Sequence, residues 1–235
     1  VVCLGPEPFQ KALGGGADIV ISGRTTDASI YAAIPLMQGC DPALVWHASK
    51  IMECGAAMAV PKSSDSMLVH MYDDHFVMQP PNPAKRVTVA NVAAHTMYEC
   101  PHPFMIHEPN GIIDAGDCTF EQIDEHHVKV SGSKLREAPY SVKLESVESL
   151  GFRTIAIGGT HDPELLAHLD EHIERVKGYL AERVRNVYPQ LADGGYQVKF
   201  VCYGKNGVMG QHEINEFSGY EVGIVIDIIS DTQDH

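Results

Sequence analysis

The sequence has little basic charge and no long hydrophobic run, and both absences exclude classes of protein. Its 235 residues include 31 acidic and 17 basic side chains, which gives a net charge of −14. Because this charge repels phosphate backbones and no dense Lys or Arg cluster offsets it, we expect no nucleic-acid partner. The apolar runs fall short of the roughly 18 residues that a membrane span needs, and no charged leader opens the chain. We therefore expect a globular, soluble, cytoplasmic protein without a membrane partner.

Motifs of several common catalytic sites are also missing. Neither G-x-S-x-G nor G-x-G-x-x-G occurs, which disfavours an α/β-hydrolase and a dinucleotide oxidoreductase, and the P-loop spacing is absent too. The six cysteines are scattered without a C-x-x-C pair, so we expect mostly buried, reduced thiols. No cofactor is expected.

Two polar groups could in principle hold a divalent ion. One combines Cys100, His102, His107 and Glu108 on a single loop, and the other is the run at 73–75. Neither follows a specific metal spacing, and chance clusters are expected among 13 histidines. These residues are better interpreted as polar side chains of solvent-exposed loops, and we predict no metal site.

The start of the chain alternates strand-like and helix-like segments, the pattern of an α/β fold. Apolar strands are predicted at 1–4 and 18–22, with a helical stretch and the breaker GGGA between them. Since neither strand alternates with polar residues, both are typical of buried parallel strands. Ligands bind beyond the carboxyl ends of such strands, and SGRTTDAS (22–29) begins at one of these ends.

The remaining pattern completes the predicted fold. A helix is expected at 42–58 with Asp41 as its N-cap, then short strands and loops, and mainly β-structure from Cys118. Apolar residues at three- and four-residue steps predict one long helix over 163–188, with strands at 196–203 and 220–230. We predict an α/β fold with a parallel or mixed sheet and flanking helices, plus a sheet-rich α+β half. The corresponding portions are 1–115, incomplete at its N-terminus, and 116–235.

Arg24 is the first candidate for substrate binding. Its guanidinium, beside Thr25 and Thr26 at a helix start, suits a carboxylate or phosphate, so we expect it to reach into a cleft. The alternative is an ion pair with Asp27 that only fixes the loop. Asp27 itself is a candidate base, although a helix cap is the better explanation of this residue.

Two further segments supply candidates. Lys205 and Asn206 lie among three glycines in YGKNGVMG, which is typical of a loop that approaches an anion closely, or of a plain β-turn. Lys143 and Glu145 share one strand face, which suits acid–base catalysis or an exposed ion pair.

Several motifs together resemble the acyclic terpene utilisation family, AtuA. They are GADIVISGRTTDASI, ECGAA, SVKLES followed by FRTIAIGG, THDPEL, CYGKNGVMG and EVGIVIDIISDTQ, in collinear order over nearly the whole chain. The chain departs from the family at Ser146, where Gly is usual, and at Tyr220, where His is usual. The family's Gly-rich N-terminal segment is missing from this sequence.

The resemblance implies an enzyme of branched-chain or terpenoid acid breakdown, and it brings no established catalytic residues. With the candidates above, we expect lyase or hydratase chemistry on a small carboxylate or acyl-CoA, with Arg24 and Lys205 neutralising the anion. The alternative is a non-catalytic assembly subunit of an acyl-CoA enzyme complex. Open sheet edges further predict a homo-oligomer or a hetero-complex.

Overall fold

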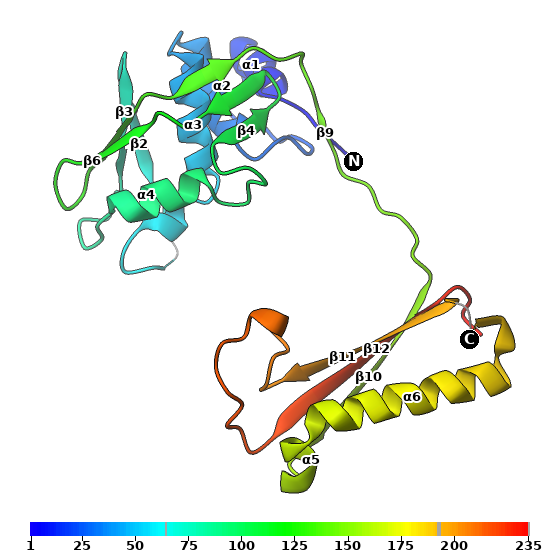
Figure 1. Cartoon of the computed structure of the whole chain (residues 1–235). Helices are drawn as coiled ribbons and strands as arrows, with labels where there is room; N and C mark the ends of the chain where they lie inside the picture. Colours follow the sequence, from blue (N-terminus) through cyan, green and yellow to red (C-terminus); the bar gives the residue numbers. More distant parts are fainter. Residues whose placement is uncertain (64, 192–193, 235) are drawn as a thin grey trace. The chain divides into compact units, whose positions relative to one another are not determined.

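The computed structural model describes residues 1–63, 65–191 and 194–234, which form two compact units (Figure 1). The first unit ends at Ser146 and the second begins at Val147. The change of sequence pattern near residue 115 is therefore not the boundary between the units. The strands that follow residue 115 pair with strands of the first unit, which keeps them in it.

The first unit contains small antiparallel sheets packed with helices. Its strands are β1 (Val2–Cys3), β2 (Leu68–Met71), β3 (His75–Gln79), β4 (Met105–Glu108), β5 (Gly111–Asp114), β6 (Thr119–Gln122), β7 (Val128–Ser131), β8 (Lys134–Arg136) and β9 (Lys143–Leu144). The sheet orders are β1-β9, β2-β3-β7-β6 and β4-β5-β8. The helices are α1 (Glu7–Gly14), α2 (Ser29–Met37), α3 (Pro42–Met52), the 3-10 helix η1 (Gly55–Met58) and α4 (Val89–Thr96).

The prediction of a parallel sheet is wrong, although the mixture of helices and strands is as expected. Every strand pair in the described chain is antiparallel, and the parallel arrangement is limited to an isolated bridge between Leu4 and Thr25. The strand expected at 18–22 is absent as well. Ile19 and Ile21 are exposed there, because no neighbouring strand in the described residues pairs with this run or covers it.

Helix α3 is the central element of the first unit. Asp41 caps it as predicted, since its Oδ1 accepts hydrogen bonds from the amides of Ala43 and Leu44 at 2.8 and 3.2 Å, and Pro42 occupies the first position. The helix ends at Met52 rather than at 58, where η1 takes over. Nearly all of α3 is buried, including Trp46 in one core cluster and Ile51 in another.

His47 lies fully buried in α3 as a neutral imidazole. Its two ring nitrogens lie 2.7 Å from the Ser133 hydroxyl and 2.9 Å from the Thr96 hydroxyl, and the Phe76 ring contacts it edge-on. Burial lowers the pKa of His47 to about 4. The charged form is therefore strongly disfavoured in the folded protein.

We expect His47 to make the first unit less stable in acid. Between pH 6.5 and about 4 the unfolded chain binds a proton at His47 that the folded chain rejects, so the contribution of His47 to the free energy of unfolding falls as pH falls through this range. The loss should reach about 3 kcal/mol. Urea unfolding at several pH values should show that the stability of the wild type relative to His47→Gln falls as pH falls through this range, and equal slopes in both proteins would contradict the prediction.

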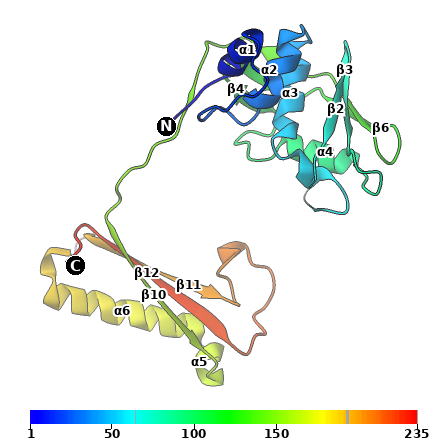
Figure 2. The ribbon, with the colours of Figure 1, turned by 180° about the vertical axis from the view of Figure 1, so that it is seen from behind.

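The second unit is a split β-α-β arrangement. It contains β10 (Phe152–Thr160), α5 (Pro163–Ala167), α6 (Leu169–Val187), the 3-10 helices η2 (Pro189–Leu191) and η3 (Gly210–His212), β11 (Tyr196–Tyr203) and β12 (Val222–Ser230). The sheet order is β10-β12-β11, and β12 is antiparallel to both neighbours. Helix α6 runs along one face of this sheet (Figures 1 and 2). Leu166 and Leu169 pack there against Cys202 and Val222.

The stretch predicted as one helix over 163–188 is two helices in the structure. The backbone leaves the helical conformation at His168, with φ −123° and ψ 28°, so α5 ends before it and α6 begins after it. Asp162 caps α5 by accepting hydrogen bonds from the amides of Glu164 and Leu165. No proline or glycine lies near His168, and the local sequence therefore offers no sign of the break.

Candidate active site

The first unit contains a cavity of about 380 Å³ with a mixed polar and apolar lining. Five chain segments meet around it together with Cys3. They are residues 24–27, the end of α3 with Lys50 and Glu53, residues 99–101, residues 105–109 and residues 141–143. Carboxylates, ammonium groups, hydroxyls and two thiols thus face one space. This combination of buried ionisable groups makes it the candidate active site.

Glu108 is the most perturbed acid in this cavity. It is the last residue of β4, where Ile106 and Glu108 alternate inward and His107 is exposed. A turn at residues 109–110 follows, and Gly111 then begins β5, where a side chain would clash with the Arg136 carbonyl of β8 at 2.8 Å. The turn leaves Glu108 at a buried position that an apolar residue would usually occupy.

Burial raises the pKa of Glu108 to about 7, and the nearby negative charge of Glu53 adds to the rise. Lys50, Thr26 and Lys143 oppose this shift without cancelling it. The Thr26 hydroxyl lies 3.5 Å from the Glu108 carboxylate and also contacts the Ser29 hydroxyl. Glu108 can consequently both hold and release a proton near neutral pH, as a general acid or base must.

Lys50 and Glu53 form a buried ion pair beside Glu108. They lie three residues apart at the end of α3, and their side chains are only 8% and 10% exposed. Burial raises the pKa of Glu53, while the bond to Lys50 opposes the rise. Burial acts to lower the pKa of Lys50, but the hydrogen bond and charge of Glu53 outweigh it and raise this pKa. The bond between them thus offsets part of the cost of burying the two groups.

Arg24 is held by two carboxylates at the rim of the cavity. Its guanidinium lies 2.9 Å from Asp27 and 3.2 Å from Glu145, and its side chain is 46% exposed. Pairing of β1 with β9 brings Glu145 here, where it also accepts a hydrogen bond from the Cys3 thiol at 3.5 Å. The hydrogen bond from Arg24 lowers the pKa of Glu145. Arg24 thus lines the cavity while its charge is already neutralised.

Two backbone amides near Arg24 are also occupied. The Thr26 amide donates to the Leu4 carbonyl at 3.0 Å, and the Ser29 amide donates to the Thr26 carbonyl at 2.9 Å. Helix α2 has no side-chain cap, so the capping role considered for Asp27 is not present. These two amides are therefore not available to an anion.

The structure brings together most of the candidates named from the sequence. Five of them line the cavity, namely Arg24, Thr25, Thr26, Asp27 and Lys143, and Glu145 is bonded to Arg24 at its edge. Lys143 makes no ion pair within the described chain. It is therefore a cavity cation that remains free to meet a ligand.

Lys205 and Asn206 belong to the second unit. The Lys205 ammonium lies 2.6 Å from Asp170, and the amides of residues 205–207 all donate to the Cys202 carbonyl. Gly207 is required for this tight turn, because a Cβ there would lie 2.9 Å from that carbonyl. The loop's amides thus close the end of β11.

The reasoning from sequence did not identify Lys50 as a site residue, and it placed Glu108 only in a possible metal cluster. The signal for Glu108 was its inward phase in the short strand MIHE, ahead of the turn residues Pro-Asn-Gly. His102, from the same proposed cluster, accepts hydrogen bonds from the amides of Phe104 and Met105. In the part of the chain that the structure describes, no three metal-binding side chains are arranged to hold an ion.

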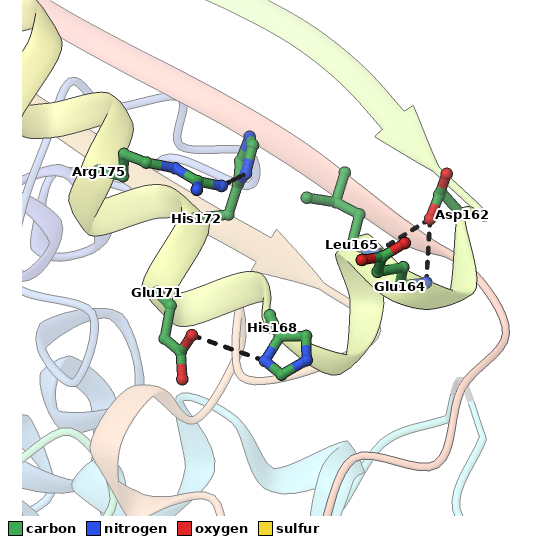
Figure 3. Close-up of a pocket in the computed structure, with 7 residues that line it drawn as sticks. All are labelled: Asp162, Glu164, Leu165, His168, Glu171, His172 and Arg175. Carbon is green, nitrogen blue, oxygen red and sulfur yellow. Dashed lines mark hydrogen bonds and ion pairs between the residues drawn. The ribbon is translucent and has the colours of Figure 1, made fainter.

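A second depression, of about 510 Å³, lies on α5 and the start of α6 (Figure 3). His168 points toward Glu171 at 3.6 Å, and His172 accepts a hydrogen bond from Arg175 at 2.7 Å. The side chains of these pairs are exposed to solvent. The cavity around Glu108 is the stronger candidate for chemistry.

No helix in the described ranges is both long and apolar enough to cross a lipid bilayer. Comparison with curated proteins and with solved structures finds no match to this chain. The family model described as acyclic terpene utilisation family protein AtuA matches residues 1–61 and 69–217, which include the whole lining of the cavity. The chain therefore belongs to the acyclic terpene utilisation family, and its role lies in the utilisation of acyclic terpenes.

Proposed function

We propose that the first-unit cavity is the active site of a lyase or hydratase that acts on a branched carboxylate or its CoA thioester. The observation that carries this proposal is Glu108, a buried carboxyl group that faces the cavity with a pKa near neutrality. Reversible loss of water from a β-hydroxyacyl compound needs one group that accepts and returns a proton. Family membership supports the choice of an acyclic branched substrate.

Glu108 carries the proton in both directions of the proposed reaction. Its carboxylate removes the proton from the carbon next to the acyl carbonyl, and the electron pair left behind forms the carbon–carbon double bond. The hydroxyl group on the neighbouring carbon leaves with its bonding electrons and takes the proton from Glu108, which releases water. Hydration is the reverse, and Glu108 begins and ends each cycle in the same state.

Lys143 is the proposed partner of the substrate's negative charge. Its ammonium group is unpaired in the described chain, whereas Arg24 is bound to Asp27 and Glu145. Apolar side chains from Met105, Ile106 and Val142 offer the surface for a branched hydrocarbon chain. A carboxylate end and an apolar body thus both find complementary groups in the cavity.

The test of this function is incubation with a panel of β-hydroxy and α,β-unsaturated branched acids and their CoA esters. Mass spectrometry should detect gain or loss of one water in at least one of them. A thermal-shift screen with the same compounds reports binding separately, because a ligand that binds only the folded state raises the melting temperature. A panel that neither binds nor reacts would contradict the proposal.

We expect Lys143→Met to weaken binding of the ligand found in this screen about tenfold, since an exposed charge-assisted hydrogen bond is lost. Titration calorimetry measures the change directly. Lys11→Met is the matched control, because Lys11 is an exposed lysine of α1 outside the cavity lining. Equal affinity in wild type and Lys143→Met would remove Lys143 from the site.

A further inference from the structure

Thr26 is the residue of the cavity lining whose hydroxyl group contacts the carboxyl group of Glu108. Its Oγ1 lies 3.5 Å from Glu108 Oε2, and Glu108 is only 8% exposed. The same Oγ1 is hydrogen-bonded to the hydroxyl group of Ser29, which is fully buried. Two hydroxyl groups and one carboxyl group thus form a short chain that runs from the first residue of α2 to the cavity.

The hydrogen bonds of this chain have one consistent direction when Glu108 is ionised. A hydroxyl group has a single hydrogen to donate, and a carboxylate can only accept. If Thr26 donated its hydrogen to Ser29, none would be left for Glu108. The Ser29 hydroxyl has no other partner within the described residues, so its own hydrogen would then be buried and unpaired. Ser29 therefore donates to Thr26, and Thr26 donates to Glu108.

The backbone around Thr26 fixes the position of its side chain. The Thr26 amide donates to the Leu4 carbonyl at 3.0 Å, and the Thr26 carbonyl accepts from the Ser29 amide at 2.9 Å. The preceding residue, Thr25, forms the isolated bridge with Leu4. These bonds anchor the segment on both sides of the Thr26 side chain. Its hydroxyl group is therefore held beside Glu108 before any ligand binds.

We propose that Thr26, supported by Ser29, is a positioning residue that holds Glu108 Oε2, so that Oε1 exchanges the proton with the substrate. No donor in the part of the chain that the structure describes is hydrogen-bonded to Oε1, which leaves this oxygen available to a ligand. A carboxyl group that is held at one oxygen presents the other in a fixed direction, as proton transfer requires. This role in the reaction rests on the proposed function, whereas the contact between Thr26 and Glu108 does not.

The hydrogen bond from Thr26 favours the ionised form of Glu108, so it opposes the effect of burial, which raises the pKa of this residue. Removal of the hydroxyl group should therefore raise the pKa of Glu108 further. The other charged or titratable groups of the cavity lining are the same in the wild type and in such a variant. They are Lys50 and Glu53 at the end of α3, Lys143 of β9, Arg24 and Asp27 of the segment that contains Thr26, Glu99, and His107 of β4.

Titration of Glu108 in the protein without substrate tests the contact. Carbon-13 NMR of protein labelled at the glutamate carboxyl groups follows this titration, and the signal missing from Glu108→Gln identifies the residue. Thr26→Val should move the titration midpoint of Glu108 upward by about one pH unit, since a hydrogen bond to a charged group is lost. An unchanged midpoint would overturn the proposal.

Thr119→Val is the matched control for this titration. The Thr119 hydroxyl also pairs with a serine hydroxyl, that of Ser131, at 2.8 Å, and Thr119 lies outside the cavity lining. The same substitution there removes a threonine–serine contact of the same kind without touching Glu108. It should leave the titration midpoint of Glu108 unchanged, and a shift equal to that of Thr26→Val would overturn the proposal.

Ser29→Ala and the double variant Thr26→Val/Ser29→Ala test the direction of the chain. In Ser29→Ala the Thr26 hydroxyl still donates to Glu108, so the midpoint should rise less than in Thr26→Val. The double variant should match Thr26→Val, because Ser29 acts through Thr26. It also leaves no buried Ser29 hydroxyl unpaired, so it supplies the measurement if Thr26→Val alone does not fold. A larger rise in Ser29→Ala than in Thr26→Val would overturn the proposed chain.

The rate of the proposed reaction tests the role of Thr26 in proton transfer. Thr26→Val should lower kcat about tenfold with little change in KM and should move the rise of the rate to higher pH, whereas Thr26→Ser keeps the hydroxyl group and should restore most of kcat. A shifted midpoint with unchanged kcat would overturn the positioning role. If no compound of the panel reacts, the proposed function fails and the role of Thr26 in it fails too, whereas an unchanged midpoint refutes the contact itself.

Discussion

Replacing Glu108 by glutamine should lower turnover of the branched acyl substrate by about 10²- to 10⁴-fold, the usual contribution of a positioned acid–base group. Glutamine has the same shape but cannot carry a proton between the two carbons. Substrate affinity should change little, because Lys143 and the apolar lining remain in place. The wild-type rate of water elimination should rise as pH passes about 7, and this rise should be missing from the residual activity of the variant.

Stability gives an independent readout of the same substitution. Above pH 7 the wild type must keep an ionised Glu108 buried, at a cost of about 3 kcal/mol relative to an ordinary carboxyl group. Glu108→Gln removes this cost and should be more stable at pH 8. Glu137→Gln is the control, since Glu137 is exposed and outside the cavity lining. A Glu108→Gln protein with full activity would show that the acid lies beside the chemistry without taking part in it.

Removing one partner of the Lys50–Glu53 pair should be the most damaging single change to stability. Glu53→Leu leaves the buried ammonium of Lys50 without its countercharge, which should cost about 3–5 kcal/mol of unfolding free energy. The double variant Lys50→Met/Glu53→Leu removes both charges and keeps the volume. It should regain most of the loss, because neither charge then has to be desolvated. Chemical denaturation of the wild type, of Glu53→Leu, of Lys50→Met and of the double variant gives the complete double-mutant cycle.

The same cycle separates a structural role from a role in the reaction. Glu53 lies close enough to raise the pKa of Glu108, so a double variant should shift the pH dependence of the rate even where stability is restored. If the single and double variants are equally unstable, the pair is not the source of the loss. If the double variant keeps the wild-type pH profile, the pair supports the cavity wall alone.

Local signals in the sequence were sufficient for much of the fold. Asp41 followed by Pro42 marks the start of α3 by the chemistry of the first helical turn, and this needs no knowledge of the rest of the chain. The apolar run at 18–22 had no such signal. A parallel strand forms only where neighbours pair with it and cover it, and the sequence of the run cannot report on neighbours.

Some residues of the candidate site could likewise be predicted from the sequence, and others could not. Arg24 and the threonines beside it stand out because polar residues interrupt an apolar stretch, and the structure does place them at a cavity. Lys50 has no comparable mark, since α3 is buried almost all round and its sequence shows no polar face against which one lysine would be unusual. Which buried polar groups meet is decided by the packing of distant segments.

The first unit buries two titratable groups that respond to pH in opposite directions. Folding makes His47 a weaker base and Glu108 a weaker acid. Between about pH 4.5 and 6.5 the folding chain releases a proton at His47 and takes one up at Glu108, so these two exchanges nearly cancel. Glu108, the buried acid of the cavity, thus also keeps the free energy of unfolding of the first unit nearly constant over this pH range. A substitution at either His47 or Glu108 leaves the other group uncompensated and makes this free energy depend on pH.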